Sequence, residues 1–298
     1  MTDTRKFIFD TDIGDDIDDA FTLALLLGKQ AESVVGVTTV YRNTAARAQQ
    51  AMAMLECMGH PEIPVYAGER FPLNREITPF FCEEKGGDYE VRKPCQWTED
   101  LDRYSVTEGA VDFIIESAKK YGKDLWIVPV GALTNVAKAI EKAPEVMRGV
   151  GGVMQMGGQF QGFTSEWNII CDPEAADVVW SSGIPVYAVG LNVTLQCGLE
   201  PDLLDAFRAS AKPHNQLLVK WLDLWFGFFP FAKSVMHDPL AVACLFTNPC
   251  TFEKVFVKVR DDGSALHTSD EKEGFSPIYA ARAVDKSVFY ALVKEVLL

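Results

Sequence analysis

The sequence predicts an α/β fold of the Rossmann-like kind, with a mostly parallel central sheet flanked by helices. Short apolar runs typical of buried strands alternate along the chain with longer segments whose apolar residues recur at helical spacing. The 298 residues are 48% apolar and 23% charged, an ordinary globular composition that is long enough for a large core. The chain has no internal repeat, low-complexity tract or linker, so we expect one domain over residues 1–298.

The first predicted elements are two strands, each followed by a helix. Residues 5–10 (RKFIFD) form an apolar run that predicts a buried strand. Residues 18–29 carry apolar side chains at helical spacing and predict a helix. A second strand is expected at 33–41 and a second helix at 44–59, which repeats the order typical of a parallel sheet.

The later elements continue this alternation. Residues 124–130 (DLWIVPV) predict a strong strand, and ALTNVAKAIEKA (132–143) predicts the helix after it. The remaining elements are expected at 149–156 (strand), 173–182 (helix), 184–190 (strand), 215–226 (helix), 239–246 (helix), 252–259 (strand) and 285–298 (helix). Residues 69–104 have little periodicity, and an irregular segment of that length is usually a functional loop or an insertion.

Charge and cysteine content exclude several classes of protein. There are 28 Lys and Arg against 42 Asp and Glu, a formal net charge of −14, which disfavours nucleic acid and anionic lipid as partners. No stretch approaches the roughly 18 apolar residues of a membrane span, and the N-terminus turns acidic before a signal-peptide core forms. The seven cysteines form no CxxC pair, which favours a reduced, cytoplasmic protein.

The most specific feature is an acidic cluster directly after the first strand. Six carboxylates fall within ten positions: Asp10, Asp12, Asp15, Asp16, Asp18 and Asp19. In a parallel sheet ligands bind beyond the carboxyl ends of the strands, and Gly14 permits a tight turn there. Because six carboxylates repel one another strongly unless a cation neutralises some of them, and because all the ligands are oxygens, we expect Ca²⁺ or Mg²⁺.

A simpler interpretation is a solvated acidic turn in which Asp18 or Asp19 caps the following helix. That interpretation does not account for Asp10 and Asp12 at the end of a buried strand. An EF-hand is excluded, because counting Asp10 as position one puts no glycine at position six and places Phe21 at position twelve.

Several motifs resemble the inosine–uridine-preferring nucleoside hydrolases, a family of calcium-dependent ribonucleoside hydrolases. DTDIGDDIDDA (10–20) is similar to the family's DxDPGxDDA, with Ile13 for proline and two extra residues. The other matching segments follow in the family's order: VPVGALTNVAKA (128–139), MGG (156–158), SEWNIICDPEAADVV (165–179), HDPLAVA (237–243) and AVDKSVFYALV (283–293). The resemblance covers nearly the whole chain and implies hydrolysis of the N-glycosidic bond of a ribonucleoside.

The resemblance also implies the metal and catalytic residues. Asp12 would be a Ca²⁺ ligand and the base that takes a proton from a calcium-bound water, and Asp10 would support it. Asp19, Asp238 and the backbone carbonyl of Val130 would complete the ligands from the protein.

The sugar contacts are implied in the same way. Asp18 would hold the ribose hydroxyls, Glu166 and Asn168 would bind other ribose oxygens, and Asn43 would lie near the sugar. The two extra residues leave an alternative, in which alignment from Gly14 gives the roles of Asp18 and Asp19 to Asp15 and Asp16. We prefer the first alignment, because IDDA then begins a helix as the family's DDA does.

On the leaving-group side, His237 is the expected proton donor, because histidine titrates near neutral pH. An alternative for the neighbouring Asp238-Pro239 is helix capping, and for Asp172-Pro173 capping is the favoured interpretation. Many family members carry a histidine after the third strand that helps at the nucleobase. This sequence has no histidine there, and aromatic residues stand in the segments expected to contact the base. Candidates for contact with the nucleobase are Phe80, Phe81, Tyr89, Trp225, Phe226, Phe228 and Phe229, although the last four also suit a buried helix.

Two other functions compete with hydrolysis. A DxD motif after a strand also occurs in metal-dependent phosphatases, but Gly14 stands where that motif carries threonine or valine. A non-catalytic nucleoside or ribose binder that retains the calcium site is the other alternative. By analogy with the family, we expect a homodimer or homotetramer.

Overall fold

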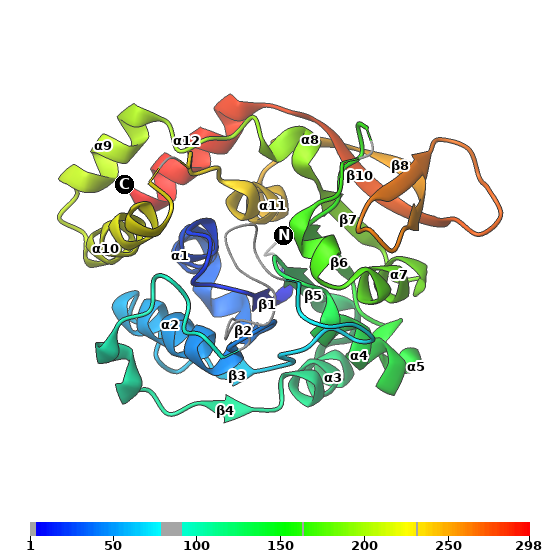
Figure 1. Cartoon of the computed structure of the whole chain (residues 1–298), viewed down its shortest axis with the longest axis horizontal. Helices are drawn as coiled ribbons and strands as arrows, with labels where there is room; N and C mark the ends of the chain where they lie inside the picture. The colour runs from blue at the N-terminus through cyan, green and yellow to red at the C-terminus, as the bar shows by residue number, and fades with distance from the viewer. Residues whose placement is uncertain (1–3, 79–90, 163, 231) are drawn as a thin grey trace.

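A ten-stranded sheet forms the centre of the computed structural model, which describes residues 4–78, 91–162, 164–230 and 232–298 (Figure 1). Its strands are β1 (Lys6–Thr11), β2 (Val34–Thr39), β3 (Val65–Ala67), β4 (Thr107–Glu108), β5 (Leu125–Pro129), β6 (Gly152–Met156), β7 (Val186–Val189), β8 (Cys250–Val259), β9 (Ala265–Thr268) and β10 (Ser276–Val284). Their order is β4-β3-β2-β1-β5-β6-β7-β10-β8-β9. Among the strands of the described residues, only the β10–β8 and β8–β9 pairs are antiparallel, which confirms the predicted fold class.

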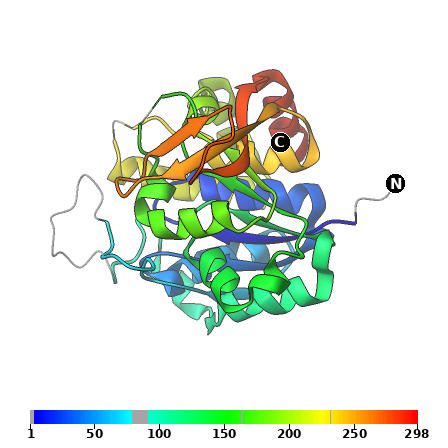
Figure 2. The same cartoon turned by 90° about the vertical axis from the view of Figure 1, so that its right-hand side faces the viewer.

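Helices cover both faces of this sheet. The helices are α1 (Asp18–Gln30), α2 (Thr44–Cys57), α3 (Ala110–Tyr121), α4 (Thr134–Lys142), α5 (Pro144–Met147), α6 (Trp167–Cys171), α7 (Pro173–Ser181), α8 (Leu191–Thr194), α9 (Pro201–Ala209), α10 (Pro213–Phe228), α11 (His237–Phe246) and α12 (Lys286–Leu297). In Figure 2 the orange β8–β9 hairpin lies beside α7, which contacts β8.

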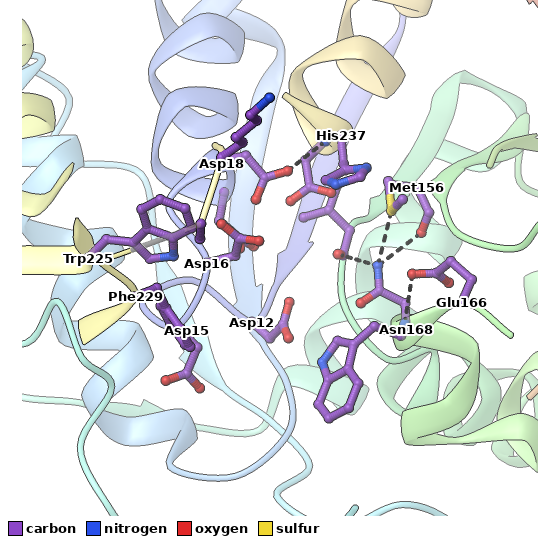
Figure 3. A pocket seen from close by; sticks show the side chains of 16 residues that line it. Asp12, Asp15, Asp16, Asp18, Met156, Glu166, Asn168, Trp225, Phe229 and His237 are labelled. Atoms are coloured by element: carbon purple, nitrogen blue, oxygen red, sulfur yellow. Dashed lines mark hydrogen bonds between the residues drawn. The ribbon is translucent and has the colours of Figure 1, made fainter. Parts of the chain in front are cut away.

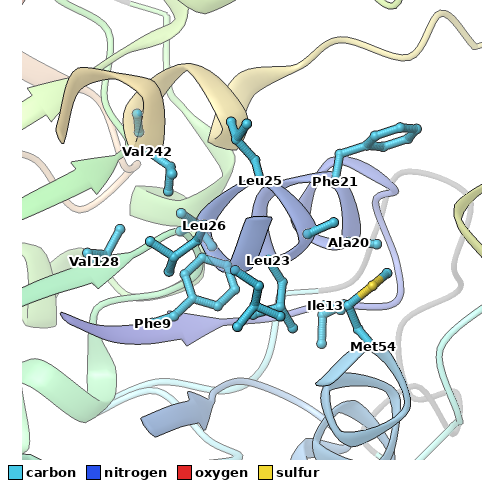
Figure 4. Packing of buried hydrophobic residues seen from close by; sticks show 14 of the residues in the cluster. Phe9, Ile13, Ala20, Phe21, Leu23, Leu25, Leu26, Met54, Val128 and Val242 are labelled. Carbon is cyan, nitrogen blue, oxygen red and sulfur yellow. The ribbon is translucent and has the colours of Figure 1, made fainter. Parts of the chain in front are cut away.

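Side chains of β1 alternate between two apolar cores, as a strand buried on both faces requires. Phe7 and Phe9 belong to the core that includes α1, α2, α10, α11 and α12, and Ile8 to the core that includes α3, α4 and α7. Figure 4 shows Phe9 beside Leu23 and Leu26 of α1. This packing on both faces fixes the position of β1 and therefore the position of the acidic residues that follow its carboxyl end.

Several strands and short helices of the structure were not predicted from the sequence. The additional elements are helices α3, α5, α6, α8 and α9 and strands β3, β4, β9 and β10, and β10 joins the antiparallel pair to the parallel sheet. β10 begins Ser-Pro and contains Arg282, so its sequence does not read as a continuous apolar run. Within 69–104, the described residues contain one short 3-10 turn, η2 (Glu99–Arg103), and no other helix or strand.

Candidate active site

A cavity of about 380 Å³ opens where the carboxyl ends of β1, β5 and β6 meet. Its lining residues are Asp12, Asp15, Asp16, Asp18, Asp19, Val130, Met156, Glu166, Trp167, Asn168, Trp225, Phe229, Ala232, Lys233, His237 and Asp238. Figure 3 shows Trp225 and Phe229 on one side, Glu166 and Asn168 on the other, and Asp12 between them. The cavity therefore combines an acidic floor with an aromatic wall.

Three carboxylates converge on one point of the acidic floor. Asp18, Asp19 and Asp238 each offer an oxygen within 4.8 Å of the others, and each is at most 4% exposed. The Asp238 backbone N–H donates to Asp18 Oδ2 at 3.0 Å, and Thr11 Oγ1 donates to Asp19 Oδ1 at 2.5 Å. Burial, followed by the repulsion of neighbouring carboxylates, raises the pKa of all three well above the usual range.

Helix capping does not account for these carboxylates. Helix α1 has Ile17 as its N-cap and α11 has Met236, so none of the three carboxylates belongs to an N-cap residue, although Asp18 accepts one first-turn N–H of α11. Among the described residues, none of the three carboxylates forms an ion pair with Lys, Arg or His. A buried all-oxygen cluster without its own counter-charge fits a hard divalent cation. The predicted ligands were Asp12, Asp19, Asp238 and the Val130 carbonyl; the structure instead brings Asp18, predicted as a ribose contact, together with Asp19 and Asp238, while Asp12 and Val130 line the same cavity outside this cluster.

The carboxylate of Asp12 can extend into the cavity because the residue next to it, Gly131, is a glycine without a side chain. A Cβ on Gly131 would lie 2.7 Å from Asp12 Oδ1 and 3.0 Å from its Cγ. Gly131 follows Val130, whose N–H donates to the Asp10 carbonyl at 2.8 Å and whose own carbonyl accepts from Asn168 Nδ2 at 2.8 Å. Desolvation raises the pKa of Asp12, which suits a carboxylate that accepts a proton.

Asp10 is completely buried and is not among the residues that line the cavity. Its Oδ1 accepts from Thr38 Oγ1 at 2.6 Å and from Asn135 Nδ2 at 2.8 Å. Burial raises its pKa to about 7, against the two hydrogen bonds that lower it. This position behind Asp12 is consistent with the supporting role that the resemblance implies.

Glu166 and Asn168 lie on the opposite wall. Glu166 accepts hydrogen bonds from the backbone N–H groups of Asn168 at 2.9 Å, Gly158 at 3.0 Å and Ile169 at 3.2 Å. Burial nevertheless raises its pKa to about 7. The Asn168 amide nitrogen donates to the carbonyls of Val130 and Met156, which ties this wall to the end of β5.

Asn43 lies outside the set of lining residues. Its Oδ1 accepts from the Ala46 N–H at 3.1 Å, so it caps α2, and its amide nitrogen donates to the Val91 carbonyl. Its predicted place near the sugar stays a prediction. Asp172 caps α7 through a bond from the Ala175 N–H at 3.0 Å, which confirms the favoured interpretation of that residue.

Asp15 and Asp16 also line the cavity but lie outside the three-carboxylate cluster. Asp15 forms an ion pair with Arg47, with 2.9 Å between Oδ2 and the guanidinium nitrogen. Asp16 accepts from the Ile17 N–H at 2.7 Å. This arrangement favours the alignment that gives the metal and ribose roles to Asp19 and Asp18.

His237 differs from the expectation based on its residue type. Its Nδ1 lies 2.7 Å from Thr194 Oγ1, and burial lowers its pKa to about 4. The ring is therefore neutral at pH 7, and Nε2 is the nitrogen left for a ligand. The prediction rested on histidine's usual titration near neutrality, and desolvation moves the pKa of this half-buried ring below that range. The role of His237 as proton donor stays a prediction.

The aromatic wall is narrower than predicted. Trp225 and Phe229 line the cavity, with ring centroids 5.7 Å apart. Phe226 packs edge-on against Trp225 and Phe228 is 44% exposed, and neither lines the cavity. Phe80, Phe81 and Tyr89 lie outside the described residues.

Sequence reasoning missed several residues of the site. Met156, Trp167 and Lys233 line the cavity, and Gly131 and Arg47 shape it from behind. Trp167 stands inside the matching segment SEWN and Gly131 follows Val130 directly, so their positions in the motifs were available signals. Arg47 gave none, because it lies on a helix remote in sequence from the loop that it contacts.

The structure resembles solved ribonucleoside hydrolases. The purine-preferring ribonucleoside hydrolase from Gardnerella vaginalis is 30% identical and superposes with a TM-score of 0.80, covering 97% of this chain and 96% of that one. Among curated proteins, the probable uridine nucleosidase 1 of Oryza sativa subsp. japonica is 31% identical over 98% of this chain and 96% of its own. The pyrimidine-specific ribonucleoside hydrolase RihA of Shewanella sp. (strain ANA-3) is 30% identical over 84% of this chain and 80% of its own.

These similarities place the chain among the hydrolases that act on N-glycosyl compounds. It belongs to the inosine-uridine preferring nucleoside hydrolase family, whose sequence pattern it matches over residues 7–291. In the part of the chain that the structure describes, no helix combines the length and apolarity needed to cross a membrane.

Proposed function

We propose that the protein hydrolyses the N-glycosidic bond of ribonucleosides to ribose and free base, with Asp12 as the base that takes a proton from the attacking water. The observation that carries this proposal is the buried cluster of Asp18, Asp19 and Asp238 on the floor of a cavity that Asp12 also lines. Positive charge develops on the sugar as the bond breaks, and surrounding carboxylates stabilise that charge.

Calcium is the proposed cation. The carboxylates of Asp12, Asp19 and Asp238 and the carbonyl of Val130 would hold it, and a carbonyl oxygen has two lone pairs, so Val130 can serve both a cation and Asn168. When bound, the ion supplies Lewis acidity, which makes a nearby water easier to deprotonate and helps to orient the sugar diol. Because that water is easier to deprotonate, Asp12 need not be an unusually strong base.

The ribose is proposed to lie between the acidic floor and the wall formed by Glu166 and Asn168. Asp18, held by the Asp238 N–H, faces the sugar hydroxyls from one side. Glu166 and Asn168 face other ribose oxygens from the other side, and their bonds to backbone groups fix their orientation.

The nucleobase is proposed to lie against Trp225 and Phe229. A planar base stacks on such rings whatever its hydrogen-bonding edge, so the wall suits a base preference different from, or broader than, that of typical members. His237 acts here as a neutral N–H donor to the departing base, because its pKa of about 4 leaves it uncharged at pH 7.

A homodimer or homotetramer, a cytoplasmic location and a single domain over residues 1–298 stay predictions that accompany this proposal. The likeness to relatives described as purine-preferring, pyrimidine-specific and uridine-directed supports ribonucleosides as the substrate class. It leaves the base to be determined by assay.

A reducing-sugar assay across purine and pyrimidine ribonucleosides tests the proposal. We expect ribose release with Ca²⁺, loss of release with a chelator and recovery when Ca²⁺ is restored. Turnover of inosine and uridine alone would contradict the broader base preference. Binding without ribose release would favour the non-catalytic alternative, and Mg²⁺-dependent phosphate release from a general phosphomonoester would favour the phosphatase.

A further inference from the structure

Arg47, on helix α2, lies behind the loop that follows β1 and is 1% exposed. Its guanidinium donates from Nη1 to the carbonyl oxygens of Asp12 and Ile13, the latter at 3.0 Å. Its Nη2 donates to Asp15 Oδ2 at 2.9 Å, and its Nε donates to the Tyr41 carbonyl at 2.8 Å. One buried side chain thus contacts three residues of the acidic loop, Asp12, Ile13 and Asp15, and Tyr41 in the segment after β2.

Arg47 also changes the charge of the cavity. Of the carboxylates that line it, Asp15 is the one that forms an ion pair with arginine or lysine among the described residues. The side chains of Arg47 and Asp15 are 1% and 9% exposed, so water screens this pair only weakly. Asp15 therefore has its own counter-charge, whereas Asp18, Asp19 and Asp238 do not.

Contacts from another segment hold the opposite side of the same loop. The Gln96 N–H donates to the Gly14 carbonyl at 3.1 Å, and Gln96 Nε2 donates to the Asp16 carbonyl at 2.7 Å. Gly14 has a φ of +119°, so the loop turns tightly between these two sets of contacts. The backbone that carries Asp12 is thereby restrained from two sides by protein groups alone.

We propose that Arg47 is a positioning residue, which fixes the backbone of Asp12 through its planar fork and keeps Asp15 out of the ligand set of the cation. This proposal depends on the proposed function in one respect only, namely that Asp12 is the catalytic base. Arginine suits this task because its guanidinium donates in several fixed directions at once, which the single ammonium of lysine cannot do. Because the backbone of Asp12 is held in this way, its carboxylate stays within the narrow range of positions that catalysis requires.

Paired variants separate positioning from simple charge balance. Arg47→Met leaves the buried Asp15 with only the longer ion pair to Arg92, at 3.8 Å, so we expect a lower Tm and a kcat reduced about 10- to 100-fold, with KM changed less. Arg47→Met/Asp15→Asn removes the buried charge that has lost its closer partner, so part of the Tm returns, but kcat stays low because the carbonyls of Asp12 and Ile13 are no longer held by Arg47. Arg47→Lys keeps the charge without the fork and should also lose kcat.

Recovery of kcat together with Tm in the double variant, or wild-type kcat in Arg47→Lys, would overturn the positioning role.

Calorimetric titration with Ca²⁺ tests whether Asp15 is outside the ligand set of the cation. Asp15→Asn should bind Ca²⁺ within about threefold of wild type, whereas Asp19→Asn should lose roughly 100-fold. Equal losses in both variants would return Asp15 to the ligand set.

A readout without turnover keeps this inference separate from the proposed function. In protein freed of metal, backbone amides of residues 12–17 should exchange hydrogen faster in Arg47→Met/Asp15→Asn than in wild type. Unchanged exchange would show that Arg47 does not hold the loop. If wild-type protein releases no ribose from any ribonucleoside, the proposed function fails, while the exchange and calcium measurements still decide the part played by Arg47.

Discussion

Replacing Gly131 with alanine tests whether the cavity depends on the close approach of Asp12. The new Cβ would lie 2.7 Å from Asp12 Oδ1, and ordinary contact begins at 3.4 Å, so one of the two must move by about 0.7 Å. Gly131 is not among the glycines with positive φ, so alanine adds no backbone strain, and its effect comes from this contact and from a second one with Val40 Cγ1 at 3.0 Å. Since a displacement of about 1 Å costs a catalytic group up to roughly 100-fold, we expect kcat to fall about 10- to 100-fold.

The assay is ribose release at saturating substrate and Ca²⁺, with Tm measured on the same protein. Gly227→Ala is the matched control, because a Cβ there meets nothing within 4 Å and the helix gains a better helix former. We expect the control to keep wild-type kcat. Wild-type kcat in Gly131→Ala would refute the inference that the carboxylate of Asp12 must occupy this position.

Three further changes test other parts of the site. Asp238→Asn should weaken Ca²⁺ binding by roughly 100-fold or more in calorimetry, whereas the exposed Asp223→Asn should not. Trp225→Leu should raise KM and lower kcat/KM about tenfold through lost stacking on the base, while Phe226→Leu, behind that wall, should have a smaller effect. Burial raises the pKa of Glu166 from 4.5 to about 7, so the folded state retains a proton that the unfolded state releases, and stability falls as pH rises through that range. Glu166→Gln should remove roughly 3 kcal/mol of this pH dependence between pH 4.5 and 8 in urea unfolding of metal-free protein, and equal slopes in both proteins would contradict it.

Local sequence signals predicted much of the parallel part of the fold. The apolar run before Asp10 and the helical spacing after Asp18 predicted β1 and α1 to within about a residue. The capping role of Asp172 was also readable, because it depends on a bond to Ala175 only three residues away. β10 was not predicted, because its place between β7 and β8 depends on sheet pairing more than on its own composition.

The site was harder to predict wherever it joins distant segments. Asp238 meets Asp18 across 220 residues of chain, and only the resemblance to a family suggested that they belong together. Arg47 and Asp15 are 32 residues apart in the sequence, and no sequence motif indicated that they form an ion pair. The lowered pKa of His237 follows from desolvation, which the tertiary structure determines, so residue type alone could not reveal it.

Ribose release by Asp12→Asn at saturating Ca²⁺ tests the central claim most directly. Asparagine keeps the shape of the side chain but cannot accept the proton of the attacking water. We predict a kcat lower than that of wild type by about 10²- to 10⁴-fold, with a Tm that shows a folded protein. Wild-type kcat in this variant would contradict the assignment of Asp12 as the base.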